Sequence, residues 1–266
     1  MGEKFQLHVS GLNMLSKCGI QFEKRYILGK KLPPNAAITI GSGVDRSSAA
    51  DLTAKKDTGT LLPTEQVLDT ARDYVVNAWP EVVPSDADKD DGLDSAGAVV
   101  DVAVSLAELH HTIAAPKIKP THIQRPWVLD IDGLPVQVAG TIDIQEGTAS
   151  IRDTKTSKRS PAADVADTSL QLTTYALAVC QHDGAIPGKV ALDYCVHTKT
   201  PKLVTIESTR TRADFPHLLE RIYQAHRMIE AGLFMPAPID AWWCSARWCG
   251  YHSTCKYAAR PVTAAA

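Results

Sequence analysis

Three residues in the middle of the chain have the types and spacing of a site that cleaves phosphodiesters. Asp143 and Asp153 lie in two β-like runs joined by a turn that contains glycine, and Lys155 follows two residues after the second carboxylate. Side chains alternate faces along a strand, so Asp153 and Lys155 project from one face, and Asp143 can approach that face if the two runs pair as a hairpin. Two converging carboxylates bind a hard divalent cation, and the neighbouring ammonium suits an anionic substrate.

A structural interpretation of the same residues has to be weighed against this one. Asp-x-Lys is a common tripeptide, and on an exposed strand it is usually a solvated ion pair that contributes little to stability. Short motifs also match by chance at a high rate. Whether these residues carry out chemistry therefore depends on what else the chain supplies.

The composition is that of an ordinary globular protein. With 266 residues, 44% hydrophobic and 22% charged, the chain suits one large domain or two small ones with a well-buried core. The net charge of −2 gives no overall basic pattern, so contacts to DNA phosphates have to come from particular lysines and arginines. The candidates nearest to the hairpin are Lys158 and Arg159.

The sequence also bears on location. It contains no run of about 18 apolar residues, and its first residues lack the apolar stretch of a signal peptide. We therefore expect no membrane-spanning helix and a cytoplasmic protein.

The first 115 residues have the patterns of helices. Ser10 or Asn13 can cap the first helix, and Pro63-Thr64-Glu65 has the pattern of a helix start. We predict helices over 10–28, 44–57, 64–79 and a stretch that ends at His111, with an acidic loop at 84–92.

After Pro120 the pattern changes to that of strands. The pair Asp132-Gly133 predicts a hairpin turn. We predict strands over 122–131, 134–145, 149–155, 188–198 and 202–208, helices over 167–183 and 211–232, and a tail at 240–260 rich in Trp and Cys. The sequence has no internal repeat and no clear linker, so we favour one α/β domain.

Two further segments add polar groups. Gln171 and Tyr175 are four residues apart on a predicted helix and share a face, where they could contact a phosphate or order a water. The alternative is that Tyr175 packs in the core and Gln171 faces solvent. Upstream, Gly41-Ser-Gly43-Val-Asp45 opens a predicted helix but lacks the Lys-Ser/Thr of a phosphate loop, so Asp45 is instead a candidate third acidic ligand.

Four segments together resemble the PD-(D/E)xK nuclease superfamily, and specifically its RecB-like branch. That branch includes nuclease domains of recombination helicases, CRISPR-adaptation nucleases and bacteriophage exonucleases. Its pattern is Gly-x-x-x-His, Gly-x-x-Asp, Asp/Glu-x-Lys and Gln-x-x-x-Tyr. The matching segments follow in the same order over most of the chain: Gly41–Asp45, Gly140–Asp143, Asp153–Lys155 and Gln171–Tyr175.

The resemblance implies an α/β fold with a restriction-endonuclease-like core, in which a mixed central β-sheet is flanked by helices. A helical region would precede this core and a Cys-rich metal-cluster segment would follow it. Residues 1–266 would then form one nuclease domain with a helical part (1–115), a catalytic sheet core (120–210) and a helix with the cysteine tail (211–260).

The resemblance also implies roles for the motif residues. Lys155 would orient the attacking water or neutralise charge on the phosphate, and Gln171 and Tyr175 would position the DNA or Lys155. Asp45 stands where the family usually has histidine, which could favour Mg²⁺ or weaken catalysis. The implied ligands of Mg²⁺ or Mn²⁺ are Asp45, Asp143, Asp153 and the backbone carbonyl of Thr154.

The six cysteines divide into two groups. Cys180 and Cys195 lie in apolar segments and are expected to be core thiols. Cys244, Cys249 and Cys255 are clustered in a short irregular segment, and in a cytoplasmic protein such a cluster indicates metal ligands rather than disulfides.

Three thiolates need a fourth ligand, for which Cys18 is the candidate and His252 the alternative. Nucleases of the RecB-like branch that hold an iron–sulfur cluster place one cysteine on an N-terminal helix and three near the C-terminus, so the resemblance favours a [4Fe–4S] cluster over Zn²⁺. We expect three tryptophans to shield the cluster, with stacking on DNA bases as the less favoured alternative: Trp242, Trp243 and Trp248.

The expected function is that of a divalent-metal-dependent DNA nuclease, with an exonuclease favoured, acting in recombination, repair or phage DNA processing in a bacterial or phage-infected cell. The alternative is a catalytically weakened, nuclease-like DNA-binding or assembly subunit with a structural zinc or iron–sulfur site. Recombination proteins are possible partners besides DNA. The sequence leaves open the oligomeric state and whether the DNA is single- or double-stranded.

Overall fold

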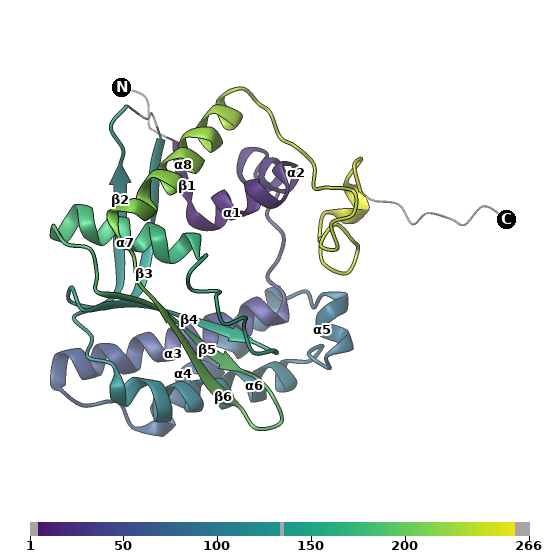
Figure 1. The fold of residues 1–266 in the computed structure, drawn as a ribbon. Coiled ribbons are helices and arrows are strands. Elements are labelled where there is room, and N and C mark those ends of the chain that lie inside the picture. The colour runs from purple at the N-terminus through teal and green to yellow at the C-terminus, as the bar shows by residue number, and fades with distance from the viewer. Residues whose placement is uncertain (1–4, 134–135, 259–266) are drawn as a thin grey trace.

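The computed structural model describes residues 5–133 and 136–258 as a six-stranded mixed sheet with helices on both sides (Figure 1). The strands are β1 (Phe5–His8), β2 (His122–Asp130), β3 (Val136–Glu146), β4 (Ser150–Ser157), β5 (Lys189–Val196) and β6 (Lys202–Ser208). The helices are α1 (Val9–Lys17), α2 (Gly19–Phe22), α3 (Ala36–Thr58), α4 (Thr64–Ala78), α5 (Asp86–Asp90), α6 (Ala96–Leu109), α7 (Leu170–Asp183) and α8 (Phe215–Glu230).

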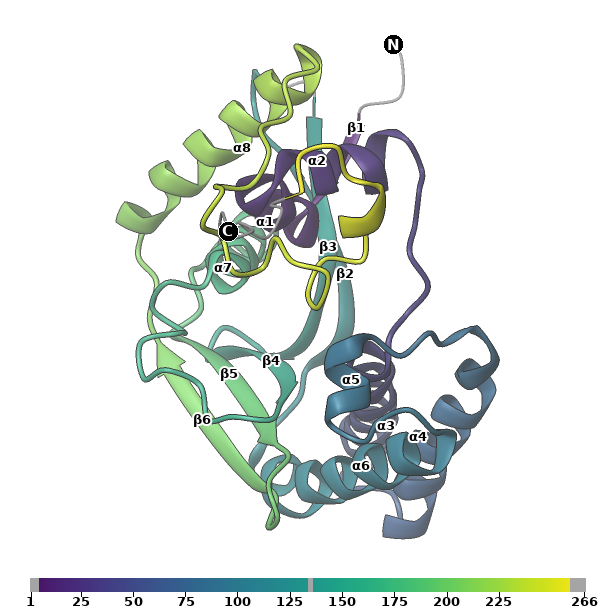
Figure 2. The same cartoon turned by 90° about the vertical axis from the view of Figure 1, so that its right-hand side faces the viewer.

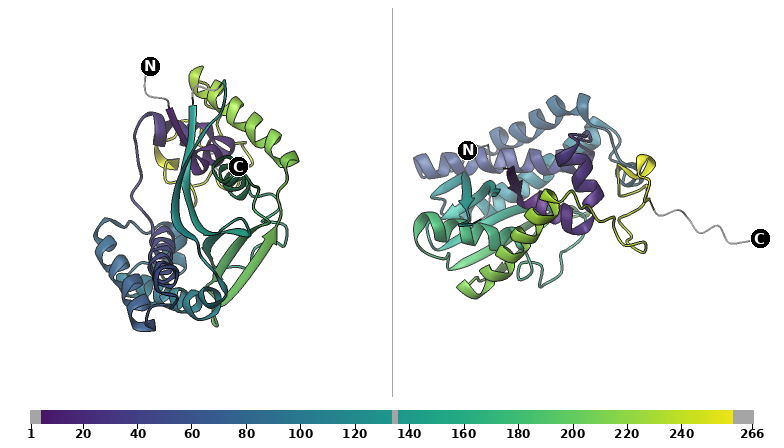
Figure 3. Two further views of the ribbon diagram at one scale, coloured as in Figure 1. Left: turned by 90° about the vertical axis from the view of Figure 1, so that its left-hand side faces the viewer. Right: turned by 90° about the horizontal axis from the view of Figure 1, so that it is seen from above.

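The strand β3 organises the sheet. Residues 137–145 pair antiparallel with β2 on one edge, with an interruption at Asp143. The other edge is shared, because β1 pairs with 136–139 in parallel and β4 pairs with 144–146 in antiparallel orientation. Residues 140–143 lie between these two partners, and on this edge the described part of the chain gives them no strand neighbour. The sheet continues from β4 through β5 to β6, and β2 and β3 curve away from these strands (Figures 2 and 3).

Two cores hold the layers together. The larger one lies between the sheet and the helices α1, α7 and α8, and it includes the fully buried residues Phe22, Leu172 and Ile222. The second core lies on the other side of the sheet, where α3, α4 and α6 pack on one another and Cys195 of β5 contributes from the sheet. Each layer therefore buries one face of the sheet, as an α/β fold requires.

The sequence-based elements of the second half are largely confirmed. Strands and helices occur where they were predicted, with ends shifted by a few residues, and α7 begins after Ser169, whose side chain accepts from the Leu172 amide. Gly133 in the turn has a φ of 78°, which explains the glycine. Residues 134–135 of the predicted second strand and 259–260 of the tail lie outside the described residues.

The N-terminal predictions need correction. Residues 5–8 form a strand, and the predicted helix over 10–28 begins at Val9 and is broken at Cys18, where the backbone is extended. The break comes from a tertiary contact, because the Gly19 amide donates to the Met235 carbonyl (2.7 Å) and a Cβ on Gly19 would lie 2.6 Å from the Met235 amide nitrogen. Neither Ser10 nor Asn13 is the N-cap of this helix.

Two further boundaries were wrong. The helix predicted over 44–57 begins at Ala36, where Asn35 caps it by accepting from the Ile38 amide (2.9 Å). The segment 41–45 therefore lies inside a helix instead of opening one. The acidic loop predicted at 84–92 contains α5, and a capping box between Ser85 and Asp88 starts this helix.

One stretch, Ala96–Lys117, is long and apolar enough by length and composition to cross a membrane. Half of its apolar part is buried inside the molecule, and α6 packs against α3 and α4. It therefore has the surroundings of a core helix.

Gly140 offers a test of the packing between β2 and β3. It pairs with Trp127, and a Cβ added to Gly140 would lie 2.7 Å from Cζ2 of the Trp127 ring. Overpacking of this kind costs about 1–3 kcal/mol. We predict that Gly140→Ala lowers the melting temperature by several degrees, since about 1 kcal/mol corresponds to roughly 2–4 °C in a domain of this size. Thermal unfolding followed by circular dichroism measures it.

The control is Gly97→Ala in α6, where an added Cβ meets no atom within 4 Å. Alanine favours a helix over glycine, so this variant keeps or raises the melting temperature. Equal melting temperatures for Gly140→Ala and the wild type would contradict the close packing of Trp127 on Gly140.

Candidate active site

The candidate site lies where β4 separates from β3. Ile144 and Arg152 form the last paired position of these strands, and Asp143 and Asp153 are the next residue on each strand. Residues directly opposite in an antiparallel pair share a face, so both carboxylates reach the place where the strands part. Here the amide of Thr154 donates to Oδ2 of Asp143 (3.2 Å) instead of to a main-chain carbonyl of β3. The Asp143 carboxylate thus takes the place of the main-chain acceptor that strand pairing would otherwise supply.

Asp153 is surrounded by the other motif residues. Its side chain is 1% exposed, and Oδ2 lies 2.5 Å from Nζ of Lys155. From α7, Gln171 Nε2 donates to Asp153 Oδ1 (2.8 Å) and to the Tyr175 hydroxyl (2.7 Å), and that hydroxyl lies 3.4 Å from the same Oδ1. Tyr175 is buried, as the structural alternative expected, but Gln171 faces Asp153 and not only solvent.

The third carboxylate comes from α3. Gln124 Nε2 of β2 donates to Oδ1 of Asp45 (2.8 Å). Gln124 stands opposite Asp143, between the pairs of Ile123 with Ile144 and Arg125 with Ile142. Its φ of 48° is unusual for a residue other than glycine and indicates local strain at the site.

Sequence patterns missed Gln124. Its strand was predicted, but nothing in the sequence marks its backbone conformation or its contact with α3. The only available signal was its place on the strand that neighbours Asp143.

The carboxylates perturb one another. Burial, followed by the charges of Asp153 and Asp45, raises the pKa of Asp143 to about 8. Burial also raises the pKa of Asp153 in spite of Lys155, and that of Asp45 in spite of its hydrogen bond with Gln124. Burial lowers the pKa of Lys155, but attraction to Asp153 and Asp143 outweighs this, so the pKa is raised.

The positive charge of Lys155 therefore offsets only part of the negative charge of the three carboxylates. One ammonium faces them all, and the pKa of each acid is raised. A hard cation bound by oxygen atoms would relieve this repulsion.

The opposite face of β4 is held by partly buried ion pairs. Arg152 Nη1 lies 2.9 Å from Oδ2 of Asp193 on β5, and Arg152 Nε lies 2.9 Å from Oε1 of Glu146 on β3. Because alternate side chains face opposite ways, these contacts fix the strand that presents Asp153 on its other face.

The two predicted DNA contacts lie apart from the carboxylates. Lys158 forms an ion pair with Asp91, just after α5, and Arg159 is exposed. Among the described residues, neither makes a hydrogen bond or ion pair with Asp45, Asp143 or Asp153. The structure therefore does not bring them into the candidate centre.

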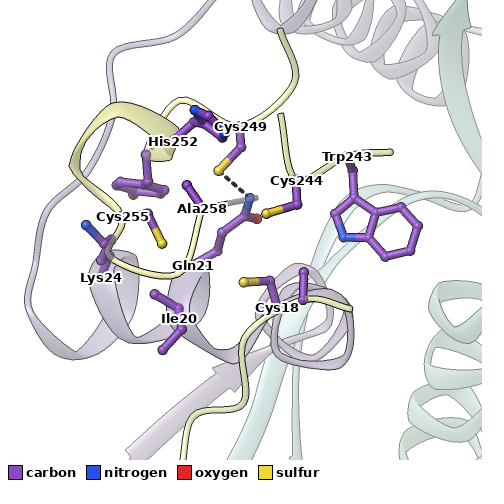
Figure 4. A pocket seen from close by; sticks show the side chains of 12 residues that line it. Cys18, Ile20, Gln21, Lys24, Trp243, Cys244, Cys249, His252, Cys255 and Ala258 are labelled. Carbon is purple, nitrogen blue, oxygen red and sulfur yellow. Dashed lines mark hydrogen bonds between the residues drawn. The ribbon is translucent and has the colours of Figure 1, made fainter. Parts of the chain in front are cut away.

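The four cysteines of the predicted cluster line one pocket between α2 and the tail (Figure 4). Cys18 comes from the break between α1 and α2, and Cys244, Cys249 and Cys255 come from the tail. Gln21 Nε2 donates to the sulfur of Cys249 (2.9 Å), and His252 also lines the pocket. Within residues 5–133 and 136–258, no group of three or more His, Cys, Asp or Glu side chains has the arrangement of a metal site.

The predictions for Cys195 and for the three tryptophans of the tail agree with the structure only in part. Cys195 is fully buried, and burial raises its pKa to about 12, as fits a core thiol. Trp243 lines the cysteine pocket. Trp242 and Trp248 are 68% and 53% exposed, so the expectation that they shield the cluster was wrong.

Comparisons with known proteins bear on the family and the fold. A sequence model of the PD-(D/E)XK nuclease superfamily matches residues 6–256. Among curated protein sequences, none matches significantly. The solved structure of a "Putative exonuclease" from Eubacterium rectale has a TM-score of 0.58 at 13% identity, covering 97% of this chain and 91% of its own, and so shares the fold. The structure of SSO0001 has a TM-score of 0.42 at 11% identity, covering 97% and 88%.

Neutralising Asp143 should stabilise the metal-free protein. Folding raises the pKa of Asp143 to about 8, so between pH about 4 and 8 the folded protein holds a proton that the unfolded chain releases. The protonated carboxyl of Asp143 does not destabilise the fold at low pH. The free energy of unfolding therefore decreases as the pH rises from about 4 to 8. We predict that Asp143→Asn melts higher than the wild type in EDTA, by at least about 2–4 °C near pH 8, and that the difference shrinks towards pH 5.

The matched control is Asp183→Asn. A hydrogen-bonded ion pair with Arg125 lowers the pKa of Asp183 to about 2, so this carboxylate stabilises the fold at neutral pH, and its neutralisation should lower the melting temperature. A lower melting temperature for both variants would show that Asp143 is not held in a repulsive cluster.

Proposed function

From the premise that the chain belongs to the PD-(D/E)XK nuclease superfamily, we propose that it is a divalent-metal-dependent DNA nuclease, a phosphodiester hydrolase. The observation that carries this proposal is the parting of β3 and β4. There Asp143 accepts from the Thr154 amide, and Asp153 lies against Lys155. Carboxylates and an ammonium thus lie at one point of the fold, an arrangement that suits metal-assisted phosphodiester hydrolysis.

The residues at this point fit a hard cation. Asp45, Asp143, Asp153 and the backbone carbonyl of Thr154 would hold Mg²⁺ or Mn²⁺. All four are oxygen donors, and the mutual repulsion of the carboxylates favours a cation between them. What the cation supplies when bound is a lower pKa for water and neutralisation of charge on the scissile phosphate.

Lys155 acts as a fixed positive charge in this proposal. Since attraction to Asp153 and Asp143 raises its pKa, the amine stays protonated at neutral pH and does not serve as a base. Its side chain is partly exposed beside a buried carboxylate, so it can orient the attacking water or offset charge that develops on the phosphate.

Gln171 and Tyr175 act through Asp153 in this proposal. Burial raises the pKa of Tyr175, so the phenol remains neutral and can donate to the Asp153 carboxylate. Together with the donation from Gln171, this fixes the orientation of Asp153. We therefore assign both residues to positioning Asp153 instead of DNA or Lys155.

We favour an exonuclease. This choice is supported by the name of the Eubacterium rectale structure, a "Putative exonuclease" that shares the fold. A role in recombination, repair or phage DNA processing, a cytoplasmic location and partnership with recombination proteins remain part of the proposal, as do a single nuclease domain and membership of the RecB-like branch.

We further propose that the cysteine pocket holds a [4Fe–4S] cluster, with Zn²⁺ as the alternative. Support comes from four thiols of two distant segments that line one pocket, with their sulfur atoms facing a shared space (Figure 4). Thiolate ligation would tie α1 and α2 to the tail. The structure already brings these segments together through Gly19 and Met235.

The proposed chemistry is tested by Asp153→Asn and Lys155→Ala. Each variant should reduce cleavage of end-labelled linear DNA in Mg²⁺ or Mn²⁺ by about 10²-fold or more, because Asp153→Asn removes a charge that would hold the cation and Lys155→Ala removes the charge that offsets the phosphate. Digestion of linear and circular substrates is compared, and cleavage of the linear form alone marks an exonuclease. EDTA should stop the reaction.

The control is Lys189→Ala on β5, which removes an exposed lysine paired with Glu207 and should leave cleavage unchanged. If folded wild-type protein cleaves no DNA with either metal, the alternative of a weakened, nuclease-like subunit is favoured. Full activity of Asp153→Asn would overturn the assignment of the site.

The cysteine pocket is tested by purification without oxygen and by metal analysis. We predict a brown protein that contains iron and sulfide, and a loss of both in Cys18→Ser, while Cys180→Ser on α7 keeps them. Colourless protein with bound zinc would support the alternative. Wild-type protein that carries neither metal would show that the pocket is not a metal site.

A further inference from the structure

The tail carries an exposed aromatic surface that the proposed nuclease centre does not use. Trp242 and Trp248 pack edge to face, with ring centroids 5.5 Å apart and planes at 86°, and both rings are more than half exposed. Other large apolar side chains are exposed nearby in sequence, at Leu233, Met235 and Ile239. Concentrations of exposed apolar side chains usually mark a binding site.

The two segments that carry and support these rings have a positive net charge. The segments 9–35 and 233–258, here called the tail unit, lie side by side (Figures 1 and 2) and contain seven Lys and Arg against two Asp and Glu, whereas the whole chain has a net charge of −2. Contacts between the segments include Tyr251 with the Lys30 carbonyl (2.6 Å) and Lys24 with the Thr254 carbonyl (3.2 Å). Charge asymmetry of this kind indicates a polyanionic partner.

Basic side chains of the tail unit lie over its aromatic rings. Arg247 lies over the ring of Trp248 (5.5 Å), and Lys256 lies over Tyr257 (4.8 Å). Surfaces that bind protein partners are depleted of lysine, whereas aromatic rings among lysines and arginines are typical of surfaces that bind single-stranded nucleic acid. Bases offer free faces for stacking only when they are unpaired.

The tail unit also borders the candidate active site. One groove is lined by Asn13 and Lys17 of α1, by Lys155 and Gln171 of the site, and by Arg221 of α8. Asp167 and Asp214 also line this groove, but each carboxylate already accepts hydrogen bonds, from Ser208 and Thr211 respectively. A strand bound on the tail unit would therefore have a route to Lys155 past Lys17.

One acidic contact lies on this surface. Arg247 forms an ion pair with Asp90 of α5, and the two side chains are 48% and 56% exposed. Ion pairs that are this exposed are weak and compete with ions in solution, so a phosphate can replace Asp90.

We propose that the tail unit binds single-stranded DNA, with bases stacked on Trp242 and Trp248 and a phosphate contacted by Arg247. The choice of DNA rests on the proposed nuclease function, while the stacking itself rests on the exposed rings and the positive net charge of the tail unit. This surface would select an unpaired end and deliver it to the groove that leads to Lys155.

The test measures binding of an end-labelled oligothymidine in EDTA, where no cleavage occurs, by fluorescence anisotropy. Trp242→Leu and Trp248→Leu remove the ring but keep an apolar side chain, and each should weaken binding by about 5- to 150-fold. An oligonucleotide of the same length without bases should bind wild-type and variant proteins equally. Replacement by phenylalanine should keep most of the affinity.

Tyr223 and Arg227 on α8 supply the matched control, because they form a similar cation–π pair outside the tail unit (5.9 Å). Tyr223→Leu should leave oligothymidine binding unchanged. Arg247→Gln should reduce the slope of log affinity against log salt concentration by about 0.7, and Arg227→Gln should not.

Three results would overturn the inference. One is wild-type affinity in the Trp242→Leu/Trp248→Leu double variant. Another is an equal loss of affinity for the strand without bases. The third is a wild-type dimer that becomes a monomer in the double variant, by light scattering, since the surface would then join two copies of the chain. Because binding is measured in EDTA, a failure of the nuclease proposal would appear separately, as absent cleavage in Mg²⁺ or Mn²⁺.

Discussion

The geometry of the candidate site depends on the point at which β4 separates from β3. β1 and β4 share one edge of β3, and residues 140–143 lie in the interval between them. The backbone there needs another partner, which the Asp143 carboxylate supplies to the Thr154 amide. The sheet and two helices meet at this interval. Helix α3 brings Asp45 to it, and helix α7 brings Gln171. A candidate site of this kind is a property of the sheet and not of a single loop.

The same interval is electrostatically unfavourable without a cation. Burial and like charges raise the pKa values of the three carboxylates, and Lys155 offsets only part of the repulsion. Gln124 adds a backbone conformation that residues other than glycine rarely adopt. The surrounding structure holds this arrangement through partly buried ion pairs on the other face of β4, where Arg152 pairs with Asp193 and Glu146. In our proposal, the protein gives up stability at this interval for a prearranged set of metal ligands, as is common at functional sites.

Much of the sheet and its carboxylates could be predicted from sequence, because alternation, turn residues and short motifs are local signals. Asp143, Asp153 and Lys155 meet as expected, and α7 places Gln171 beside them. The errors have a common cause in tertiary contacts. The helix break at Cys18 comes from the packing of Gly19 against Met235, and β1 is a strand only because it pairs with β3. The role of Gln124 depends on its φ, which no local sequence pattern predicts. The exposure of Trp242 depends on how the tail packs on the rest of the protein, which again has no local sequence signal.

The central claim is that Asp45, Asp143 and Asp153 form one site for a divalent cation. Isothermal titration calorimetry of Mn²⁺ into metal-free wild-type protein and into Asp143→Asn tests it most directly, since the cysteine pocket is the same in both proteins. If the three carboxylates act together, the wild type shows a binding event that is absent or greatly weakened in Asp143→Asn. Identical Mn²⁺ binding by the two proteins would contradict the claim.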